Sequence, residues 1–386
     1  MSEIIAETPF TTYFPNVLMD NDIPRPEKET VAIIGSGNWG SAISMLISQN
    51  VNKYKVFNKE VKMWVFEEQI GDRKLTDIIN TEHENVKYLP GHKLGENIIA
   101  VPDVVDVVKD ATILVFVVPH QFLRRLLKQI KPHLRPDVFA VSLIKGLDHD
   151  NQGHLEMITD IISRELNIDC SILSGANVAN GVANGEFAEA TIGYSNREHA
   201  ELIQVLFHTD NFCTELVNDP VGVEFCGALK NIIALGAGFI DALGEGSNTK
   251  AALIRIGLME MKKFAKMFYH GARSATFFQS SGVADLITTC YGGRNVRCAE
   301  AFVKTKKSWS EIENEMLNGQ KLQGTSTCKQ VYDVLVAYQM ETEFPLFSMI
   351  YNISFRGYEP SLIIEACRQH YSHLTSKYSY MKEEGY

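Results

Sequence analysis

The chain has few cysteines, and they are not arranged to bind a metal. Its 386 residues contain seven cysteines, and no two of them form a Cys-x-x-Cys pair. An odd number of scattered thiols argues against a disulfide scaffold and against a structural zinc site. We therefore expect reduced thiols and no bound metal.

The chain also lacks a basic run, a signal core and an uninterrupted apolar span. A net charge of −10 without a compensating basic segment excludes a general nucleic-acid binder. Residues 1–29 are acidic and have no apolar core, unlike a secretory or mitochondrial leader. The apolar stretch 225–243 contains Lys230, Asn231 and Asp241, which argues against a membrane span. We expect a soluble, cytoplasmic protein that binds neither nucleic acid nor membrane.

What is present begins with a glycine-rich turn between a strand and a helix. Residues 31–42 read VAIIGSGNWGSA, so four apolar residues suited to a buried strand lead into Gly35-x-Gly37-x-x-Gly40. In a dinucleotide site the first glycine makes the tight turn and the second lets the pyrophosphate approach the backbone. The third lets the helix pack against the strand. Since N–H groups at the helix start bind phosphate, the segment predicts a dinucleotide-binding site.

Short apolar runs alternate with helical periods over the first half of the chain. This βαβ rhythm predicts an α/β, doubly wound, Rossmann-like domain whose ligands lie at the carboxyl ends of the strands. The expected strands are residues 61–66, 98–101, 112–118, 138–143 and 171–173, and the expected helices are 121–130 and 154–166.

Beyond residues 218–220 the pattern is helical, with no convincing strand. The expected helices are residues 221–243, 249–269, 299–305, 310–317, 326–338 and 345–355. We therefore expect an all-helical C-terminal domain on the substrate side. The predicted division is a flexible extension (1–29), a dinucleotide-binding domain (30–218), a helical domain (219–372) and a tail (373–386).

Several candidate residues follow the predicted strands. Glu67 and its neighbour Glu68 end the second strand, where an acid usually holds the ribose hydroxyls and repels a 2′-phosphate. A surface acidic pair is the alternative. Phe122 lies in the turn after the fourth strand, beside His120, which we expect to be structural rather than catalytic. Lys145 follows the fifth strand and points into the expected crevice unless it is a solvated loop lysine.

One lysine lies inside an apolar helical segment. Lys230 stands in GALKNIIAL, and a buried ammonium is costly unless it has a partner or a function. Burial lowers the pKa of a lysine toward the range in which it exchanges protons near pH 7. The alternative is that the side chain extends to the surface and keeps its ammonium in water. Asp285 offers a counter-charge from another apolar segment, and Arg294 follows two glycines with a guanidinium suited to a phosphate.

With these residues assembled, the chain resembles the NAD-dependent glycerol-3-phosphate dehydrogenases of the eukaryotic cytosolic type. The matching blocks include GSGNWGSA (35–42), WVFEE (64–68), FVVPHQF (116–122), SLIKG (142–146), GAN (175–177), GALKN (227–231), NTKAA (248–252), GVADLITTCYGGRN (282–295) and NGQKLQG (318–324). The resemblance implies an oxidoreductase that reversibly reduces dihydroxyacetone phosphate with NADH to sn-glycerol 3-phosphate, and a homodimer.

The resemblance also implies roles for individual residues. Lys230 is implied as the general acid/base, supported by Lys145, Asp285 and Thr289. The implied substrate-binding residues are Lys145, Lys230, Asn231, Arg294 and Asn295. The implied NAD contacts are Gly35, Ser36, Gly37, Asn38, Trp39, Gly40, Phe66, Phe122, Lys145, Ala179, Arg294, Lys321 and Gln323.

Two other functions compete with this interpretation. Hydroxyacid and 6-phosphogluconate dehydrogenases share the Rossmann-plus-helical plan and often use a lysine, but they need carboxylate recognition in place of Gly-Gly-Arg-Asn. A non-catalytic NAD-binding protein is the other alternative, and the intact Lys145, Lys230 and Asp285 argue against it.

Overall fold

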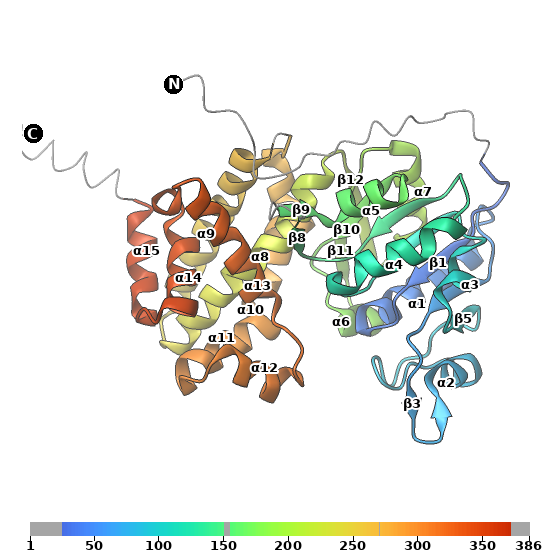
Figure 1. Ribbon diagram of the computed structural model, residues 1–386, viewed down its shortest axis with the longest axis horizontal. Coiled ribbons are helices and arrows are strands. Elements are labelled where there is room, and N and C mark those ends of the chain that lie inside the picture. The colour runs from blue at the N-terminus through green and yellow to red at the C-terminus, as the bar shows by residue number, and fades with distance from the viewer. Residues whose placement is uncertain (1–24, 150–154, 270, 372–386) are drawn as a thin grey trace, which may run out of the picture. The chain divides into compact units, whose positions relative to one another are not determined.

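A computed structural model describes residues 25–149, 155–269 and 271–371, and the chain divides into two compact units (Figure 1). Among the described residues, the sheet unit comprises 25–149, 155–224 and 279–281. The helical unit comprises 225–269, 271–278 and 282–371. The sequence-based boundary after residue 218 lies just before helix α8 (Pro220–Ala242), whereas the structural division falls within that helix. The predicted C-terminal tail, residues 373–386, lies outside the described residues.

The sheet unit is built on one eight-stranded sheet with the order β12-β11-β10-β7-β6-β1-β2-β5. Neighbouring strands pair in parallel except β10 and β11, which are antiparallel. The strands are β1 (Val31–Ile34), β2 (Val61–Trp64), β5 (Ile98–Val101), β6 (Ile113–Phe116), β7 (Phe139–Ser142), β10 (Cys170–Ser174), β11 (Ala188–Gly193) and β12 (Phe212–Val217). Two small hairpins join β3 (Gln69–Ile70) to β4 (Arg73–Lys74) and β8 (Leu147–His149) to β9 (Leu155–Met157).

Both faces of this sheet are covered by helices, as the doubly wound prediction requires (Figure 1). Successive residues of β1 belong to different cores, with Ile33 in one and Ile34 in the other, because side chains along a strand alternate between the two faces of the sheet. Helices α1 (Asn38–Lys53) and α7 (Arg197–Phe207) contribute to the first core. Helices α3 (Val104–Val108), α4 (Leu123–Ile130) and α5 (Ile158–Leu166) contribute to the second. The unit also contains α2 (Leu75–Glu82) and α6 (Ala179–Ala183).

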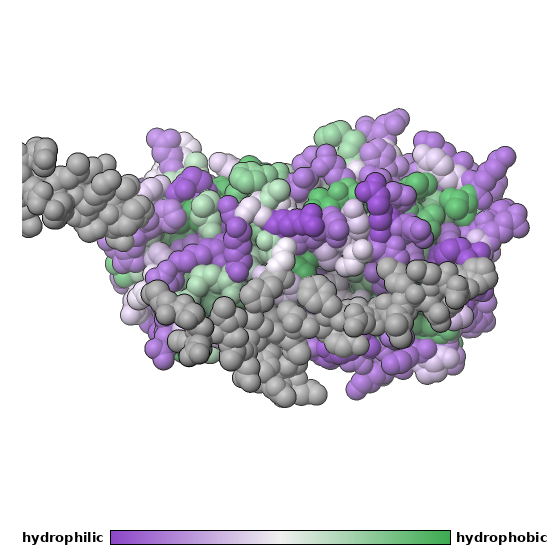
Figure 2. Space-filling model, turned by 90° about the horizontal axis from the view of Figure 1, so that it is seen from above, coloured by the Kyte–Doolittle hydropathy of each residue, from purple (hydrophilic) through white to green (hydrophobic). Residues whose placement is uncertain are grey.

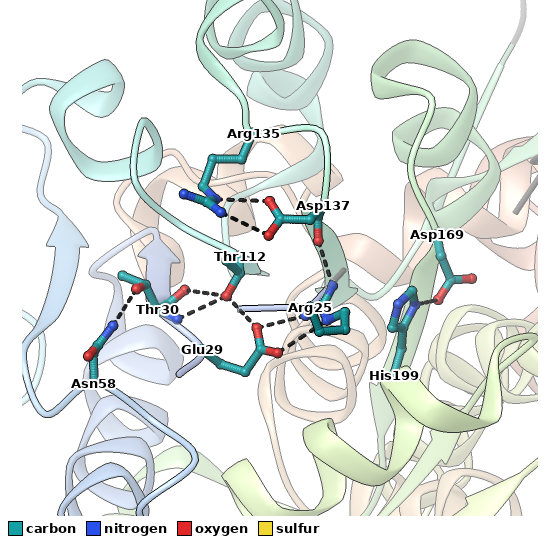
Figure 3. A network of polar contacts seen from close by, with 9 residues as sticks. All are labelled: Arg25, Glu29, Thr30, Asn58, Thr112, Arg135, Asp137, Asp169 and His199. Carbon is teal, nitrogen blue, oxygen red and sulfur yellow. Dashed lines mark hydrogen bonds and ion pairs between the residues drawn. The ribbon is translucent and has the colours of Figure 1, made fainter. Parts of the chain in front are cut away.

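A polar network joins the amino ends of the central strands (Figure 3). The Arg25 guanidinium donates to the Glu29 carboxylate at 2.7 Å and to the carbonyl oxygen of Asp137 at 2.6 Å. The same carboxylate accepts from the Thr112 hydroxyl at 2.5 Å. These residues precede β1, β6 and β7, so the network fixes the edge of the sheet opposite the carboxyl ends. Residues 25–29 of the predicted extension are thus tied to the sheet unit, and residues 1–24 lie outside the described residues.

The helical unit contains no strand in its described residues. After α8, its helices are α9 (Ser247–Phe268), α10 (Asp285–Tyr291), α11 (Arg294–Thr305), α12 (Trp309–Leu317), α13 (Gln323–Ala337), α14 (Pro345–Arg356) and α15 (Ile363–Gln369). Helix α8 is long and apolar enough to cross a membrane, but its most apolar window is completely buried within the protein, as in a core helix. On the face seen in Figure 2, hydrophilic residues cover most of the described surface and apolar residues form separate patches.

The helix predicted over residues 154–166 is wrong at its start. Residues 155–157 form strand β9, and α5 begins only at Ile158. Strands β11 and β12, the two hairpins and helices α2, α3, α6, α7, α10 and α15 were not predicted. The other predicted strands and helices are present, with ends that differ by a few residues.

Candidate functional site

The glycine turn after β1 shows why two of its glycines are required. Gly35 has a φ of +123°, and a Cβ atom there would lie 2.5 Å from the carbonyl oxygen of Val117. A Cβ atom on Gly40 would lie 2.3 Å from the carbonyl oxygen of Gly35. Only glycine therefore lets the chain turn sharply at residue 35 and lets α1 pack against this turn.

Gly37 has a different environment, because it faces open space. A Cβ atom on Gly37 would meet no atom within 4 Å. Gly37 is the N-cap residue of α1, and no side chain caps this end of the helix. The first turn of α1 carries no acidic residue. The helix therefore presents uncapped N–H groups and its positive dipole end, which suits a pyrophosphate.

The other residues of the turn hold it in place. The Asn38 amide donates to the carbonyl oxygen of Tyr88 at 2.8 Å and to the Asn180 side chain at 3.0 Å. Ser36 is buried, and the Trp39 ring lies 6.4 Å from that of Phe212.

The remaining sheet-unit candidates all follow strands of the sheet. Phe66 and Phe122, which follow β2 and β6, are 69% and 55% exposed. Exposed rings at the carboxyl ends of these strands are free to pack against a ligand. The Lys145 ammonium, after β7, donates to the carbonyl oxygen of Gly175 at 3.3 Å. Ala179 begins α6, after β10. Lys145 and Gly175, which this hydrogen bond joins, therefore both lie at the carboxyl edge of the sheet.

Asn177 is a residue that the sequence reasoning did not single out. Its side-chain nitrogen is buried and has no hydrogen-bond partner among the described residues. A buried donor without a partner costs free energy, so such a group indicates a ligand. The signal in the sequence is the Gly-Ala-Asn block at residues 175–177, which follows β10.

The two acids after β2 have protein partners. The Glu67 carboxylate accepts from the Thr76 hydroxyl at 2.7 Å and from its backbone N–H at 3.3 Å, at the start of α2. Glu68 pairs with Lys87 and accepts from the Tyr88 hydroxyl at 2.6 Å. Partial burial alone raises the pKa of Glu68, but these hydrogen bonds outweigh it and lower that pKa.

In the helical unit, Lys230 lies in a buried polar cluster rather than snorkelling to the surface. Lys230 and Asp285 are 5% and 3% exposed. The ammonium donates to the Asp285 carboxylate at 2.5 Å and to the Thr289 hydroxyl at 2.6 Å. That hydroxyl donates to the carbonyl oxygen of Asp285, one turn earlier in α10. Spacing of four residues thus puts carboxylate and hydroxyl on one helix face, and both orient the ammonium.

Two predicted phosphate residues contact each other. The Asn295 amide donates to the side-chain oxygen of Asn231 at 2.9 Å, and its own oxygen accepts from the backbone N–H of Gly324 at 2.9 Å. Asn231 follows Lys230 on α8, so these bonds connect the lysine helix to the start of α11 and α13.

Arg294, Lys321 and Gln323 are at the ends of neighbouring helices. Arg294 begins α11 and donates to the side chain of Gln320 at 3.0 Å. Lys321 pairs with Glu313 at 2.8 Å, and Gln323 begins α13. Among the described residues, no group of three or more His, Cys, Asp or Glu side chains could hold a metal ion. All seven cysteines are free thiols.

Comparison with known proteins decides the family. The family model described as the N-terminus of NAD-dependent glycerol-3-phosphate dehydrogenase matches residues 30–200, and that of its C-terminus matches residues 219–365. The chain belongs to the NAD-dependent glycerol-3-phosphate dehydrogenases. The Bos taurus relative named cytoplasmic glycerol-3-phosphate dehydrogenase [NAD(+)] is 53% identical over 89% of this chain and 99% of its own. The Homo sapiens relative of the same name is 51% identical over the same shares.

Solved glycerol-3-phosphate dehydrogenases have the same fold. The Plasmodium falciparum enzyme gives a TM-score of 0.85 at 42% identity and covers 88% of this chain and 95% of its own. The Saccharomyces cerevisiae enzyme gives 0.83 at 43% identity and covers 88% and 99%. A D-mandelate dehydrogenase, at a TM-score of 0.52 and 13% identity, shares the fold alone. The predicted family and fold are confirmed, and NAD is the dinucleotide that fits the glycine turn and the uncapped α1.

Proposed function

We propose that the chain catalyses the reversible NADH-dependent reduction of dihydroxyacetone phosphate to sn-glycerol 3-phosphate in the cytoplasm. The observation that carries this proposal is the buried Lys230 ammonium held by Asp285 and Thr289 in a member of this family. The reaction links glycolysis to glycerolipid synthesis and re-oxidises cytosolic NADH.

Residues 30–218 serve as the NAD-binding domain. The N–H groups at the start of α1 bind the pyrophosphate, and Phe66 and Phe122 pack against the cofactor. The remaining cofactor contacts come from Ser36, Asn38, Trp39, Ala179, Arg294, Lys321 and Gln323. Bound NADH supplies the hydride that reduces C2 of the substrate. The Asn177 side-chain nitrogen donates a hydrogen bond to the cofactor or the substrate.

Lys230 is the proton donor for the C2 oxygen. The alkoxide that develops there attracts the ammonium, which first stabilises the negative charge and then transfers a proton. In the reverse direction the neutral amine accepts the hydroxyl proton. Asp285 and Thr289 hold Nζ in one orientation, and Lys145 supplies a second cation near the reacting oxygen.

Residues 219–372 serve as the substrate and dimerisation domain, and the protein is a homodimer. Arg294 binds the substrate phosphate through parallel hydrogen bonds, together with Asn231 and Asn295. Binding energy from this remote phosphate orients C2 for reaction. A protein with a net charge of −10 needs such local cations to attract two anionic ligands.

A substrate comparison tests the proposal. NADH oxidation is measured by absorbance with dihydroxyacetone phosphate and with carboxylated 2-oxo acids, and the product is identified. We expect turnover with the phosphate ester to form sn-glycerol 3-phosphate and little turnover with the acids. Preference for a carboxylate would instead support the related hydroxyacid dehydrogenases, and no turnover of either substrate would support a non-catalytic NAD-binding protein.

A further inference from the structure

A second buried lysine of the helical unit has no role in the proposed reaction. Lys250 lies in the first turns of α9 and is 9% exposed. Its ammonium donates to the Asp241 carboxylate at 2.7 Å, and Asp241 lies in the last turn of α8, the helix that carries Lys230. A buried ammonium requires such a partner, and this ion pair connects the end of α8 to α9.

The same ammonium lies over an aromatic ring. Its Nζ atom is 4.6 Å from the centroid of Tyr291, the last residue of α10, whose side chain is otherwise exposed to solvent. A cation at this distance from the ring face is attracted by the ring quadrupole, more strongly when it is desolvated. Lys250 therefore fixes the carboxyl end of α10.

Helix α10 is consequently bound to lysines at two places. Asp285 and Thr289 bind Lys230, and Tyr291 binds Lys250. Cys290 is buried between these contacts. Burial raises the pKa of its thiol to about 12, and the charges of both lysine–aspartate pairs act on it. The Lys230–Asp285 and Lys250–Asp241 pairs therefore both act electrostatically on Cys290 of α10.

Two glycines join Tyr291 to Arg294, the first residue of α11, and Gly293 has a φ of +91°. Since glycines have no side chain to pack, Tyr291 is the last side-chain anchor before the guanidinium. On the far side, a Cβ atom on Gly238 would lie 2.5 Å from the carbonyl oxygen of Val296, so α11 packs directly against α8.

We propose that Lys250, together with Asp241 and Tyr291, is a positioning residue that places Arg294 to bind the substrate phosphate. This inference rests on the proposed function. Lys250 acts through Tyr291 and the glycine pair and does not contact the reacting atoms. Its removal weakens phosphate recognition while the Lys230 cluster, held by its own hydrogen bonds, keeps its chemistry.

The test compares Lys250→Met with Lys250→Arg. Arginine keeps the ion pair and the ring contact, whereas methionine keeps only the length of the side chain. We expect Lys250→Met to raise KM for dihydroxyacetone phosphate by about tenfold to a hundredfold, with a smaller loss of kcat. Lys250→Arg is expected to restore most of this KM. Activity with dihydroxyacetone, which has no phosphate, is expected to stay unchanged.

Three further variants distinguish the proposed effect from a folding defect. Tyr291→Leu changes an exposed side chain and is expected to raise the same KM, whereas Tyr291→Phe, which keeps the ring, is not. Lys304→Met removes an exposed lysine that pairs with Glu300 at 2.5 Å in the same unit, and it serves as the matched control. The inference is overturned if Lys250→Met leaves KM unchanged, if it lowers activity with both substrates equally, or if arginine restores nothing.

The wild-type protein separates this inference from the proposed function. Failure of the wild type to turn over dihydroxyacetone phosphate refutes the proposed function alone. Binding of inorganic phosphate, measured by calorimetry, then decides the inference, because Lys250→Met is expected to weaken it and Lys304→Met is not. Equal phosphate binding by the wild type and Lys250→Met would overturn the inference.

Discussion

At the scale of single residues, we propose that the chain separates proton transfer from anion binding. Lysine is suited to the first because burial shifts its pKa readily, whereas the guanidinium of arginine stays charged and has a planar, forked set of donors. The structure fits this division. The buried Lys230 ammonium donates to a carboxylate and a hydroxyl, and Arg294 lies at a helix end and donates to the Gln320 side chain.

Arg294→Lys tests the assignment of the phosphate contact. We expect a higher KM for dihydroxyacetone phosphate and a lower kcat, because a point charge does not reproduce two parallel hydrogen bonds and C2 is misplaced. Dihydroxyacetone is expected to be a very poor substrate for the wild type and to lose little further in the variant. Equal losses with both substrates in steady-state assays would show that Arg294 acts on the cofactor or the reacting carbon.

At the scale of helices and strands, we expect the end of β2 to govern the choice of coenzyme. Glu68 forms an ion pair with Lys87, whereas the Glu67 carboxylate accepts hydrogen bonds from the uncharged Thr76. We expect the Glu67 carboxylate at the end of this strand to repel a 2′-phosphate.

We expect kcat/KM to be higher with NADH than with NADPH by at least about tenfold, which corresponds to only 1.4 kcal/mol. Glu67→Gln is expected to narrow this ratio, and Glu82→Gln, at an exposed position of the same region, is the control. Similar kcat/KM values for the two coenzymes in the wild type would contradict the interpretation of this strand end.

The start of α14 depends on a carboxylate from another helix. Glu260 on α9 is buried and accepts from the backbone N–H groups of Leu346 and Phe347 at 2.8 and 2.9 Å. Burial raises its pKa from 4.5 to about 7, although these hydrogen bonds oppose the shift. Since the folded protein holds this proton more tightly than the unfolded chain, stability falls as the pH rises from about 4.5 to 7.

Glu260→Gln removes this titration and keeps an acceptor for α14. We expect the fall in Tm between these pH values to be smaller in the variant, by about 2 °C or more. Thermal unfolding followed by circular dichroism checks this, with Glu300→Gln, at a partly exposed position, as the control. Equal slopes of Tm against pH in wild type and Glu260→Gln would contradict the account.

The sequence predicts elements well where a local pattern decides them. The glycine turn, the parallel strands and helix α8 follow from apolar runs and spacing within a few residues. Strands β11 and β12 were missed because they follow the antiparallel step at β10, which the βαβ rhythm does not contain. The helix predicted from residue 154 begins late because Leu155–Met157 pairs with Leu147–His149 in a hairpin, and this strand pairing overrides local helix propensity.

The same limit applies to the candidate site. A lysine in an apolar helix signals a special role by itself, and Asp285 was a natural counter-charge. The unpaired amide of Asn177 and the contact of Lys250 with Tyr291 depend on residues brought together by folding, so no local pattern reveals them.

At the scale of the whole molecule, we expect the two units to divide the work of the reaction. The sheet unit carries the glycine turn and the uncapped start of α1, and the helical unit carries the Lys230 cluster. Each group of residues is held by contacts within its own unit. Loss of the proton donor is therefore expected to leave cofactor binding in place.

Lys230→Ala measures this division most directly. NADH binding is followed by fluorescence titration and turnover of dihydroxyacetone phosphate by absorbance, on the same preparation. The account predicts a Kd for NADH close to that of the wild type and a loss of kcat of about a hundredfold to ten-thousandfold, the usual contribution of a positioned proton donor. A variant that keeps a tenth or more of the wild-type kcat, or one that no longer binds NADH, would contradict it.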